Sequence, residues 1–434
     1  MSIRPALAKA MAVVALLPGF AWGQDESRVV VARSASPAAM FAARPANAGQ
    51  FRTLPANAGL YSGDLIVGLP GGALTSANRA VTVKSLADYD SRSEQPIFET
   101  AIVLHDSKDI DLDLTLDRGR VDITNVRSMG PATVRARFWD QSWRIVLDSP
   151  NTRVTIELVG RWPSGARFKP LPPTGDPAKA PAPAASVVLL LLSGSATVDV
   201  GGVALGLKAP PGPAQLTWNS LAGARPQPLK LEKLPDWADP QAAQSEDAKR
   251  IVAALEKFRS ARAEDPAKAI ETFLASADPI DQRIALVTLG AVDDIETLGK
   301  SLVAARSLDQ WDFGITVLRH WLGRSRGQDQ RYYEILRTTR GYTPGQAQTI
   351  VQLLFGFSPE DLLQAETYEV LIDYLIHEKP AIRNIASWHL VRLVPQGKSI
   401  PHKPNGSLAD AQTTYEAWKK LIPRGELPPP PKKE

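Results

Sequence analysis

The sequence predicts a multidomain protein in which an all-β domain is followed by an all-α helical domain. Residues 60–222 contain short apolar runs separated by glycine- and proline-rich turns, which is typical of antiparallel strands. Across residues 241–422, apolar residues recur at steps of three and four, the periodicity of amphipathic helices. Residues 223–240 are rich in proline, so we interpret them as the linker between the two domains.

Residues 1–23 have the three parts of a secretory signal peptide. Arg4 and Lys9 stand before or at the start of an apolar run over residues 10–22, and small residues precede the expected cleavage after Gly23. The run is shorter than the roughly 20 residues that a membrane-spanning helix needs. An uncleaved anchor is the alternative. We expect a mature chain without a transmembrane segment that is extracytoplasmic, either periplasmic or secreted.

The composition is that of an ordinary globular protein and argues against several classes of function. Hydrophobic residues make up 44% of the chain and charged residues 22%, so both domains are able to bury a core. The formal net charge of +4 is too small to predict a nucleic-acid-binding surface. The chain has no cysteine, so it offers no disulfide, thiolate nucleophile, cysteine-based metal site or lipid-modified cysteine.

The N-terminal part is expected to lead into the β domain. Residues 24–59 form an Ala/Pro-rich lead-in, in which residues 45–49 and 55–59 have the same sequence, Pro-Ala-Asn-Ala-Gly. Whether this turn-forming unit is a linker or a pair of β-corners stays open. Residues 163–185 are expected to form a Pro-rich solvated loop. Strands are expected at residues 64–69, 80–86, 97–105, 109–117, 120–126, 133–139, 143–147, 153–159, 187–192, 196–200, 203–207 and 215–218.

Three motifs of the β domain resemble the FecR-type extracytoplasmic domain. They are Gly63–Val67, Leu116–Ile123, and Leu191–Gly194 with the later Leu207–Ala209. The resemblance covers residues 60–220 and implies an exported, antiparallel, sandwich-like domain. FecR-type regulators carry a cytoplasmic anti-sigma segment and a membrane span before this domain, so the resemblance does not imply sigma-factor regulation here. Residues 119–123 also echo residues 194–200, which suggests two related β-units.

Ten helices are expected in residues 241–422, several of them beginning at a proline, which fits the first helical turn. Their expected ranges are 241–263, 266–276, 279–291, 295–307, 309–324, 329–339, 344–355, 359–378, 380–394 and 408–422. Residues 279–289 and 380–390 carry arginine, alanine and leucine at nearly the same steps, a pattern that resembles the HEAT-type helix. The resemblance implies stacked helix pairs, although no clean period of roughly 40–47 residues is visible. Residues 423–434 form a Pro/Lys tail.

Three aspartates, Asp109, Asp111 and Asp113, alternate with apolar residues and are expected on the solvated face of a strand. A calcium site is the alternative, but the glycine of the calcium-loop pattern is missing. The arginines expected to neutralise these carboxylates across strands are Arg118, Arg120, Arg135 and Arg137.

No catalytic, cofactor-binding or metal-binding residue is predicted. No two histidines have metal-ligand spacing on a helix, and no nucleophile elbow, P-loop or dinucleotide-binding motif is present. His320 and His389 each neighbour a tryptophan in an expected helix, which favours packing roles. The five histidines are His105, His320, His377, His389 and His402.

Four tryptophans are candidate ligand-stacking residues: Trp139, Trp143, Trp162 and Trp218. Exposed aromatic side chains on a β domain could stack on a glycan, whereas the alternative is packing in the core and in turns.

These observations predict an exported, non-catalytic scaffold or sensor of the cell envelope. We expect it to bind a protein partner through the concave surface that stacked helices form. One alternative is an envelope polysaccharide-binding protein that uses its β domain. The other is an envelope hydrolase that uses a pair of carboxylates. No cofactor and no nucleic-acid partner are expected.

Overall fold

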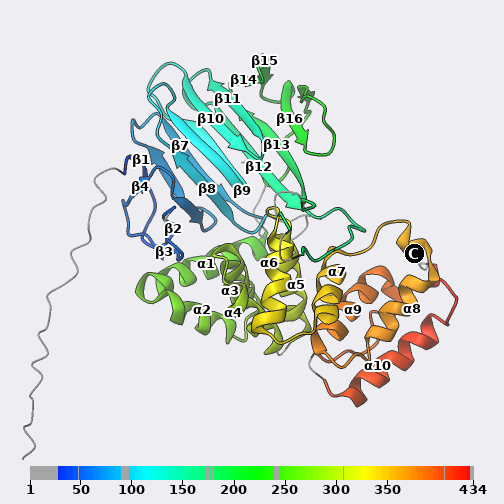
Figure 1. The fold of residues 1–434 in the computed structure, drawn as a ribbon. Helices are drawn as coiled ribbons and strands as arrows, with labels where there is room; N and C mark the ends of the chain where they lie inside the picture. Colours follow the sequence, from blue (N-terminus) through cyan, green and yellow to red (C-terminus); the bar gives the residue numbers. More distant parts are fainter. Residues whose placement is uncertain are drawn as a thin grey trace, which may run out of the picture.

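A computed structural model of the protein contains a β-rich region followed by a helical region, as the sequence predicts (Figure 1). The structure describes residues 28–46, 48–88, 97–172, 175–176, 180–238, 245–305, 307–404 and 406–430. The expected signal peptide at residues 1–23, and parts of the expected linker and tail, lie outside the described residues. Among the described helices, none combines the length and the apolar character needed to cross a membrane.

The described strands form a 17-stranded sheet. They are β1 (Val30–Ser34), β2 (Phe41–Arg44), β3 (Arg52–Thr53), β4 (Gly59–Tyr61), β5 (Leu65–Gly68), β6 (Ala73–Ser76), β7 (Val81–Leu86), β8 (Thr100–His105), β9 (Leu112–Asn125), β10 (Ala132–Phe138), β11 (Gln141–Leu147), β12 (Arg153–Arg161), β13 (Ala184–Ser193), β14 (Ser195–Val200), β15 (Val203–Lys208), β16 (Pro213–Asn219) and β17 (Leu229–Lys230). Side chains from all parts of the sheet bury one apolar core, in which Phe138 and Trp143 are fully buried.

Strand β9 belongs to two sets of strands. Its first half pairs with β8 and β10, and its second half pairs with β7 and β12. The change occurs at Gly119, whose φ of +91° favours glycine, and a Cβ there would overlap the carbonyl oxygen of Glu99. The two strands predicted at residues 109–117 and 120–126 are therefore one strand. The β9–β10 pairing is parallel, whereas the other described pairings are antiparallel.

A second crossing occurs at Gly194, between β13 and β14. Strand β13 pairs with β12 and β16, whereas β14 pairs with β11 and β15. Gly194 has a φ of +79°, and a Cβ there would lie 2.5 Å from Oγ1 of Thr152. The sequence echo between residues 119–123 and 194–200 thus marks two glycines at which the chain leaves one set of strands and joins the other.

Within the lead-in predicted at residues 24–59, the described residues contribute strands β1, β2 and β3 and the start of β4 to the sheet. Strand β1 pairs with β4 and β6, and β2 pairs with β3 and β5. The core side chains here are mostly small, such as Ala32, Ala42 and Ala43, and all three are buried. Alanine is a weak strand signal, which is why the composition did not reveal these strands.

The described helical region contains ten α-helices with short connections. They are α1 (Glu246–Glu264), α2 (Pro266–Leu274), α3 (Pro279–Ala291), α4 (Ile295–Val303), α5 (Leu308–Leu322), α6 (Gln328–Glu334), α7 (Pro344–Phe355), α8 (Ala365–Tyr374), α9 (Pro380–Leu393) and α10 (Leu408–Leu421). A π-helical turn, η2 (Ile335–Thr339), follows α6, and 3-10 turns occur at η3 (Asp361–Leu363) and η4 (Pro395–Gly397). Side-chain caps explain many of the starts: Asp265, Asp278 and Asp294 each accept from an amide in the first turn that follows.

The helix predicted to begin at Pro359 does not form there. Ser358 and Asp361 bond each other's backbone amides at 2.9 and 3.1 Å, which closes the short 3-10 turn η3. Helix α8 begins only at Ala365. By contrast, prolines do stand at the first turns of α2, α3, α7 and α9, as predicted.

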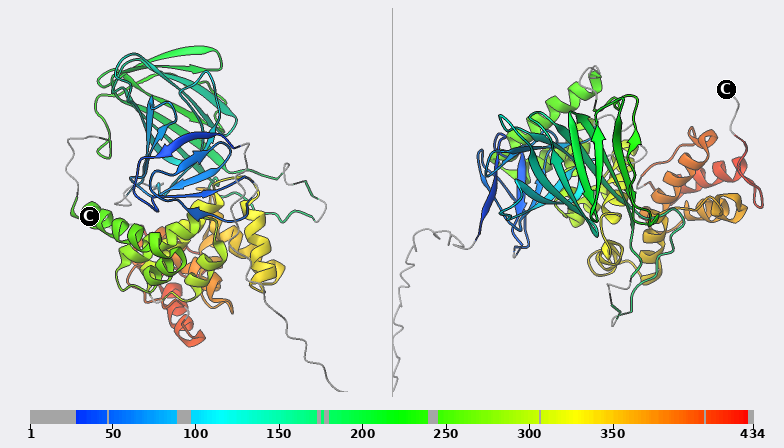
Figure 2. Two further views of the ribbon diagram at one scale, coloured as in Figure 1. Left: turned by 90° about the vertical axis from the view of Figure 1, so that its left-hand side faces the viewer. Right: turned by 90° about the horizontal axis from the view of Figure 1, so that it is seen from above.

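The helices lie on one side of the strand region, and the last ones extend beyond it (Figure 2). The two regions share apolar packing, because Phe98 and Phe168 of the strand region belong to the core of the helices.

Candidate functional site

Charged side chains from both regions are buried together where the helices meet the strands. Glu99 lies just before β8, Arg118 lies on β9, and Arg324 follows α5; their side chains are 4%, 6% and 5% exposed. Nε of Arg118 donates to Glu99 at 3.0 Å, and Arg324 also pairs with Glu99. Burial alone would raise the pKa of Glu99, but the charges of Arg324, His320 and Arg118 hold it well below its usual range. The sequence predicts that Arg118 neutralises Asp109, Asp111 and Asp113, but in the structure it pairs with Glu99 and with Asp117.

Asp293, which follows α3 with a φ of +62°, gathers a second set of donors at the same place. Arg44 of β2 pairs with it at 3.0 Å, and Nε1 of Trp321 donates to it at 3.0 Å. Arg324 approaches the same carboxylate at 3.5 Å. Burial alone would raise the pKa of Asp293, but these donors lower it. The carboxylates and arginines of the two regions therefore neutralise one another.

The two regions also touch through their backbones. A Cβ on Gly323, at the end of α5, would lie 2.5 Å from the carbonyl oxygen of Gly160 in β12, and a Cβ on Gly160 would overlap the carbonyl of Gly323. Two residues further on, Trp162 donates from Nε1 to the carbonyl of Leu322 at 3.0 Å. Its ring stacks on Phe355 of α7, with centroids 4.4 Å apart. Only glycine at residues 160 and 323 allows the two backbones to lie this close together.

The loop predicted at residues 163–185 is not wholly solvated, because its first part lies against α6 and α7. Gln352 accepts from the amide of Phe168 at 2.9 Å and donates to the carbonyl of Ala166 at 3.0 Å. Gln330 makes the same pair of bonds with the amide of Leu171 and the carbonyl of residue 169, both at 3.0 Å. The contacts of the junction therefore set how the two regions are oriented.

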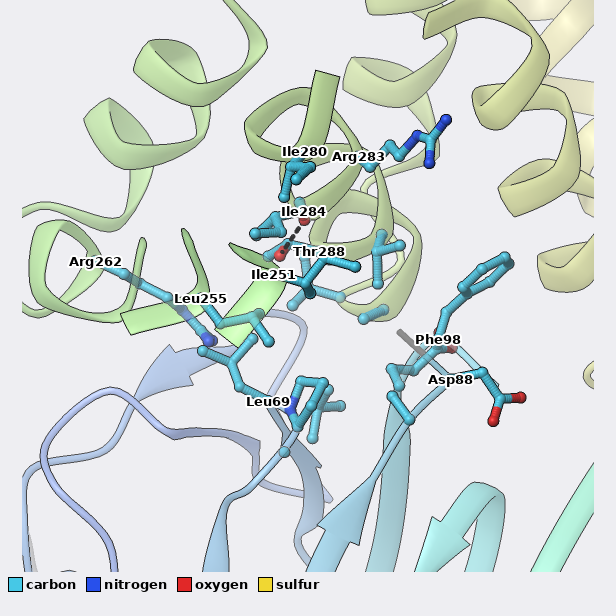
Figure 3. Close-up of a pocket in the computed structure, with 18 of the residues that line it drawn as sticks. Leu69, Asp88, Phe98, Ile251, Leu255, Arg262, Ile280, Arg283, Ile284 and Thr288 are labelled. Carbon is cyan, nitrogen blue, oxygen red and sulfur yellow. Dashed lines mark hydrogen bonds between the residues drawn. The ribbon is translucent and has the colours of Figure 1, made fainter. Parts of the chain in front are cut away.

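An apolar cavity of about 90 Å³ opens at this junction (Figure 3). It lies between helices α1, α3 and α5 on one side and the segments around β5 and β8 on the other. Apolar side chains from both regions line it, among them Leu69, Phe98, Ile251, Leu255 and Ile284. Apolar pockets between domains, with a few polar groups, are common sites for ligands.

Most of the charged groups that line the cavity are paired. Asp88 accepts from Arg120 at 2.7 Å, so Arg120 does not neutralise Asp109, Asp111 or Asp113 as predicted. Arg283 pairs with Asp309 at 2.6 Å, and Glu99 is neutralised as described above. The remaining charged side chain of the lining is Arg262 of α1.

Arg262 is 5% exposed and lines the cavity. Its Nη1 donates to the carbonyl of Ala39 at 3.3 Å. Within the described chain, no carboxylate forms an ion pair with it. Burial lowers the pKa of Arg262 to about 10, so the guanidinium is still charged at neutral pH. The cavity thus combines an apolar wall with one buried positive charge.

The four tryptophans predicted to stack on a ligand do not form a common face. Trp143 is fully buried and Trp218 is 9% exposed, and both rings pack edge-on against Phe138. Trp162 is occupied by its stacking at the junction. Only Trp139, in the β10–β11 turn, is substantially exposed, at 43%. Three of the four rings therefore pack against neighbouring side chains, two of them in the core of the strand region and one at the junction.

Of the three aspartates predicted on a solvated face, Asp109 is exposed and Asp111 is half-buried, and both precede β9. Asp113 is instead buried, at 2% exposure. Arg135 and Arg137 of the adjacent strand cover Asp113 with hydrogen bonds of 3.1 and 2.7 Å, as the cross-strand prediction required. Within the described residues, no cluster of three or more potential ligands is arranged to hold a metal ion.

The histidines are engaged in local contacts. Nε2 of His105 lies 2.7 Å from the hydroxyl of Thr115, and His402 bonds Asn384 at 2.9 Å. His320 lies near Glu99, while His377 accepts from a nearby amide at 3.0 Å. His389 is buried, and its Nε2 lies 2.7 Å from the carbonyl of Leu353.

We expect His389 to make the protein sensitive to acid. Burial lowers the pKa of His389 to about 3, and the charges of Arg319 and Arg392 act in the same direction. The unfolded chain, with a histidine pKa near 6.5, binds the proton first, so stability is full above that pH and falls as the pH is lowered. Between pH 7 and pH 4 the loss from this residue is on the order of 3 kcal/mol. Urea unfolding of the wild type and His389→Gln at several pH values measures it; equal losses in both proteins would contradict it.

Sequence reasoning missed the residues that make the junction. Glu99 sits in an apolar run of a predicted strand, and this isolated charge was the available signal. Arg262 and Arg324 lie in helices expected from the sequence, where an arginine has no distinctive pattern. Their significance arises only when the two regions are brought together.

Comparisons with protein-family models, with curated proteins and with solved structures found no match for this chain.

Proposed function

We propose that this protein is an exported, non-catalytic scaffold or sensor of the cell envelope that binds a protein partner at the junction cavity. The observation that carries the proposal is an open apolar cavity that contains one buried charge without an ionic partner in the described chain. Helices α1, α3 and α5 contribute much of its lining, which agrees with a binding role for the helical half. The signal peptide expected from the sequence supports the extracytoplasmic location.

We further propose that the strand region is a FecR-like sandwich and the helical region a HEAT-like array. In support, the glycines of the three resembling motifs, Gly63, Gly119 and Gly194, all have positive φ angles, so they are required by the backbone. The two similar helices, α3 and α9, both begin with a proline and carry buried alanine and leucine side chains at matching steps.

The state of the junction carboxylates supports a binding role over a hydrolytic one. Glu99 and Asp293 are paired with arginines, and their pKa values are lowered, so at neutral pH both are ionised and held in place. A general acid needs a pKa near the operating pH. For the polysaccharide alternative, only Trp139 among the four tryptophans offers an exposed ring.

A capture experiment with matched tryptophan substitutions tests the proposal. Leu255→Trp fills the cavity from α1, whereas Val252→Trp adds the same ring at a residue of that helix that is 44% exposed. We expect the chain without residues 1–23 to capture a specific protein from the extracytoplasmic fraction. Val252→Trp should retain this partner and Leu255→Trp should lose it, because only the second change blocks the cavity. Circular dichroism establishes that both variants are folded.

The opposite results would reject the proposal. Retention of the partner by Leu255→Trp would place binding elsewhere on the molecule. Failure of the wild type to capture any specific protein would remove the basis for a scaffold or sensor of this kind.

A further inference from the structure

Arg262 has no carboxylate partner within the described chain, although a neighbouring arginine of the same helix has one. Arg259, one turn earlier on α1, holds the helix to the same turn of the strand region by donating to the carbonyl of Ala38 at 3.0 Å. Yet Arg259 also has a carboxylate partner, Glu256, at 2.5 Å. Arg262 donates to the neighbouring carbonyl of Ala39 but pairs with no described carboxylate. The difference is that Arg262 lines the cavity and Arg259 does not.

The chemistry of a buried guanidinium defines the group that would bind it. Removing a charge from water is unfavourable unless an opposite charge and hydrogen bonds compensate for it. A planar guanidinium matches a carboxylate best, because two parallel hydrogen bonds form between them. Figure 3 shows Arg262 reaching from α1 toward Leu255 and Leu69, so a carboxylate bound to it would lie beside the apolar wall.

The size of the cavity restricts what accompanies the carboxylate. Its volume of about 90 Å³ is smaller than the roughly 150 Å³ of an engineered apolar cavity that binds benzene. It therefore suits one short aliphatic side chain and is too small for a long acyl chain. One aliphatic side chain next to one carboxylate is the chemistry of the last residue of a polypeptide, and such C-termini are recognised in other proteins.

We infer that the junction cavity binds the free C-terminus of a protein partner that ends in leucine, isoleucine or valine, with its carboxylate paired to Arg262. The inference rests on the proposed function, since it assumes that the partner is a protein. It adds the chemical group that is recognised and the residue that recognises it.

Peptides that differ only at the terminal group test the inference. The probes are fluorescent hexapeptides of glycine and serine that end in leucine, isoleucine or valine, each as the free acid and as the carboxamide. Binding to the chain without residues 1–23 is measured by fluorescence anisotropy. We expect the acids to bind at least tenfold more tightly than the amides, because the amide carries no charge to pair with the guanidinium. This first comparison needs no variant, so it does not depend on a substituted protein folding.

Variants of two arginines on one helix assign the effect. Arg262→Gln should bind acids and amides alike, and Arg262→Lys should keep part of the preference because it keeps the charge. The matched control, Arg259→Gln, removes an arginine from α1 that lies outside the cavity and should keep the full preference. Equal binding of acids and amides by the wild type, no binding of either, or a preference that survives in Arg262→Gln would overturn the inference.

Failure here is distinct from failure of the proposed function. If the capture experiment finds a partner that Leu255→Trp loses, while acids and amides bind alike, the cavity binds a protein through some other part of its surface. If no partner is captured, the proposed function itself is rejected.

Discussion

Replacing Glu99 by glutamine is expected to destabilise the protein by about 3–5 kcal/mol. The substitution keeps the size of the side chain but removes the negative charge that Arg118 and Arg324 share. Both guanidiniums are almost fully buried, so neither is able to regain its hydration without opening the junction. Urea denaturation, followed by far-ultraviolet circular dichroism and by tryptophan fluorescence, measures the loss.

An exposed ion pair provides the matched control. Asp312 and Arg392 are joined by two hydrogen bonds, at 2.6 and 2.8 Å, but their side chains are 43% and 42% exposed. Asp312→Asn should therefore change the stability by less than about 1 kcal/mol, because water solvates the charge that remains. If Glu99→Gln were as mild as Asp312→Asn, the buried cluster would not be what holds the two regions together.

The pH dependence of Glu99→Gln gives a second readout of the same cluster. Because the pKa of Glu99 is lowered in the folded protein, its contribution is present above the unfolded pKa near 4.5 and is lost as the pH falls below it. Wild-type stability should therefore decline more steeply below pH 4.5 than that of Glu99→Gln. Parallel declines would mean that Glu99 is not held ionised by its arginines.

Replacing Gly323 by alanine is expected to destabilise the protein by about 1–3 kcal/mol and to loosen the junction. The added Cβ would lie 2.5 Å from the carbonyl oxygen of Gly160 and 2.8 Å from Cα of Arg161. Both obstacles are backbone atoms of β12, so no side-chain rotation relieves the overlap. The strand and the end of α5 must separate, which also weakens the hydrogen bond from Trp162 to Leu322.

The measurement combines stability with local accessibility. Urea denaturation gives the free energy of unfolding, and limited proteolysis reports whether the loop that follows Trp162 becomes cleavable. Gly345→Ala is the control, because Gly345 lies in the first turn of α7 and a Cβ there has nothing within 4 Å. Gly345→Ala should be neutral or slightly stabilising. Equal behaviour of the two variants would show that the close approach at Gly323 is unimportant.

Local patterns predicted many of the elements well. Helix α3 begins and ends where the sequence predicts, because a proline in the first turn and the apolar periodicity both lie within its thirteen residues. Strands β10 and β11 were likewise predicted, from apolar runs bounded by turns. Such signals depend only on neighbours in the chain, so no knowledge of the fold is needed to interpret them.

The fate of individual side chains was less predictable. Trp139 and Trp143 lie four residues apart at one hairpin, and nothing in the sequence distinguishes which of the two rings is exposed. Trp143 is fully buried and Trp139 is 43% exposed, because one ring faces the core and the other stands in the turn. Which face of a strand is covered depends on what packs against it, and that information is not in the strand itself.

From the amino-acid order alone, the succession of strands followed by helices and many helix starts follow, since each depends on contacts within a few residues. The junction and its cavity belong to the tertiary structure. Glu99 and Arg324 are separated by 225 residues, and Arg262 and Ala39 by 223. In the sequence, a charged residue of a strand or helix has no distinctive pattern, but burial removes its charge from water and then requires an opposite charge nearby. Only the folded protein shows which charges are buried together and which one lacks an ionic partner within the described chain.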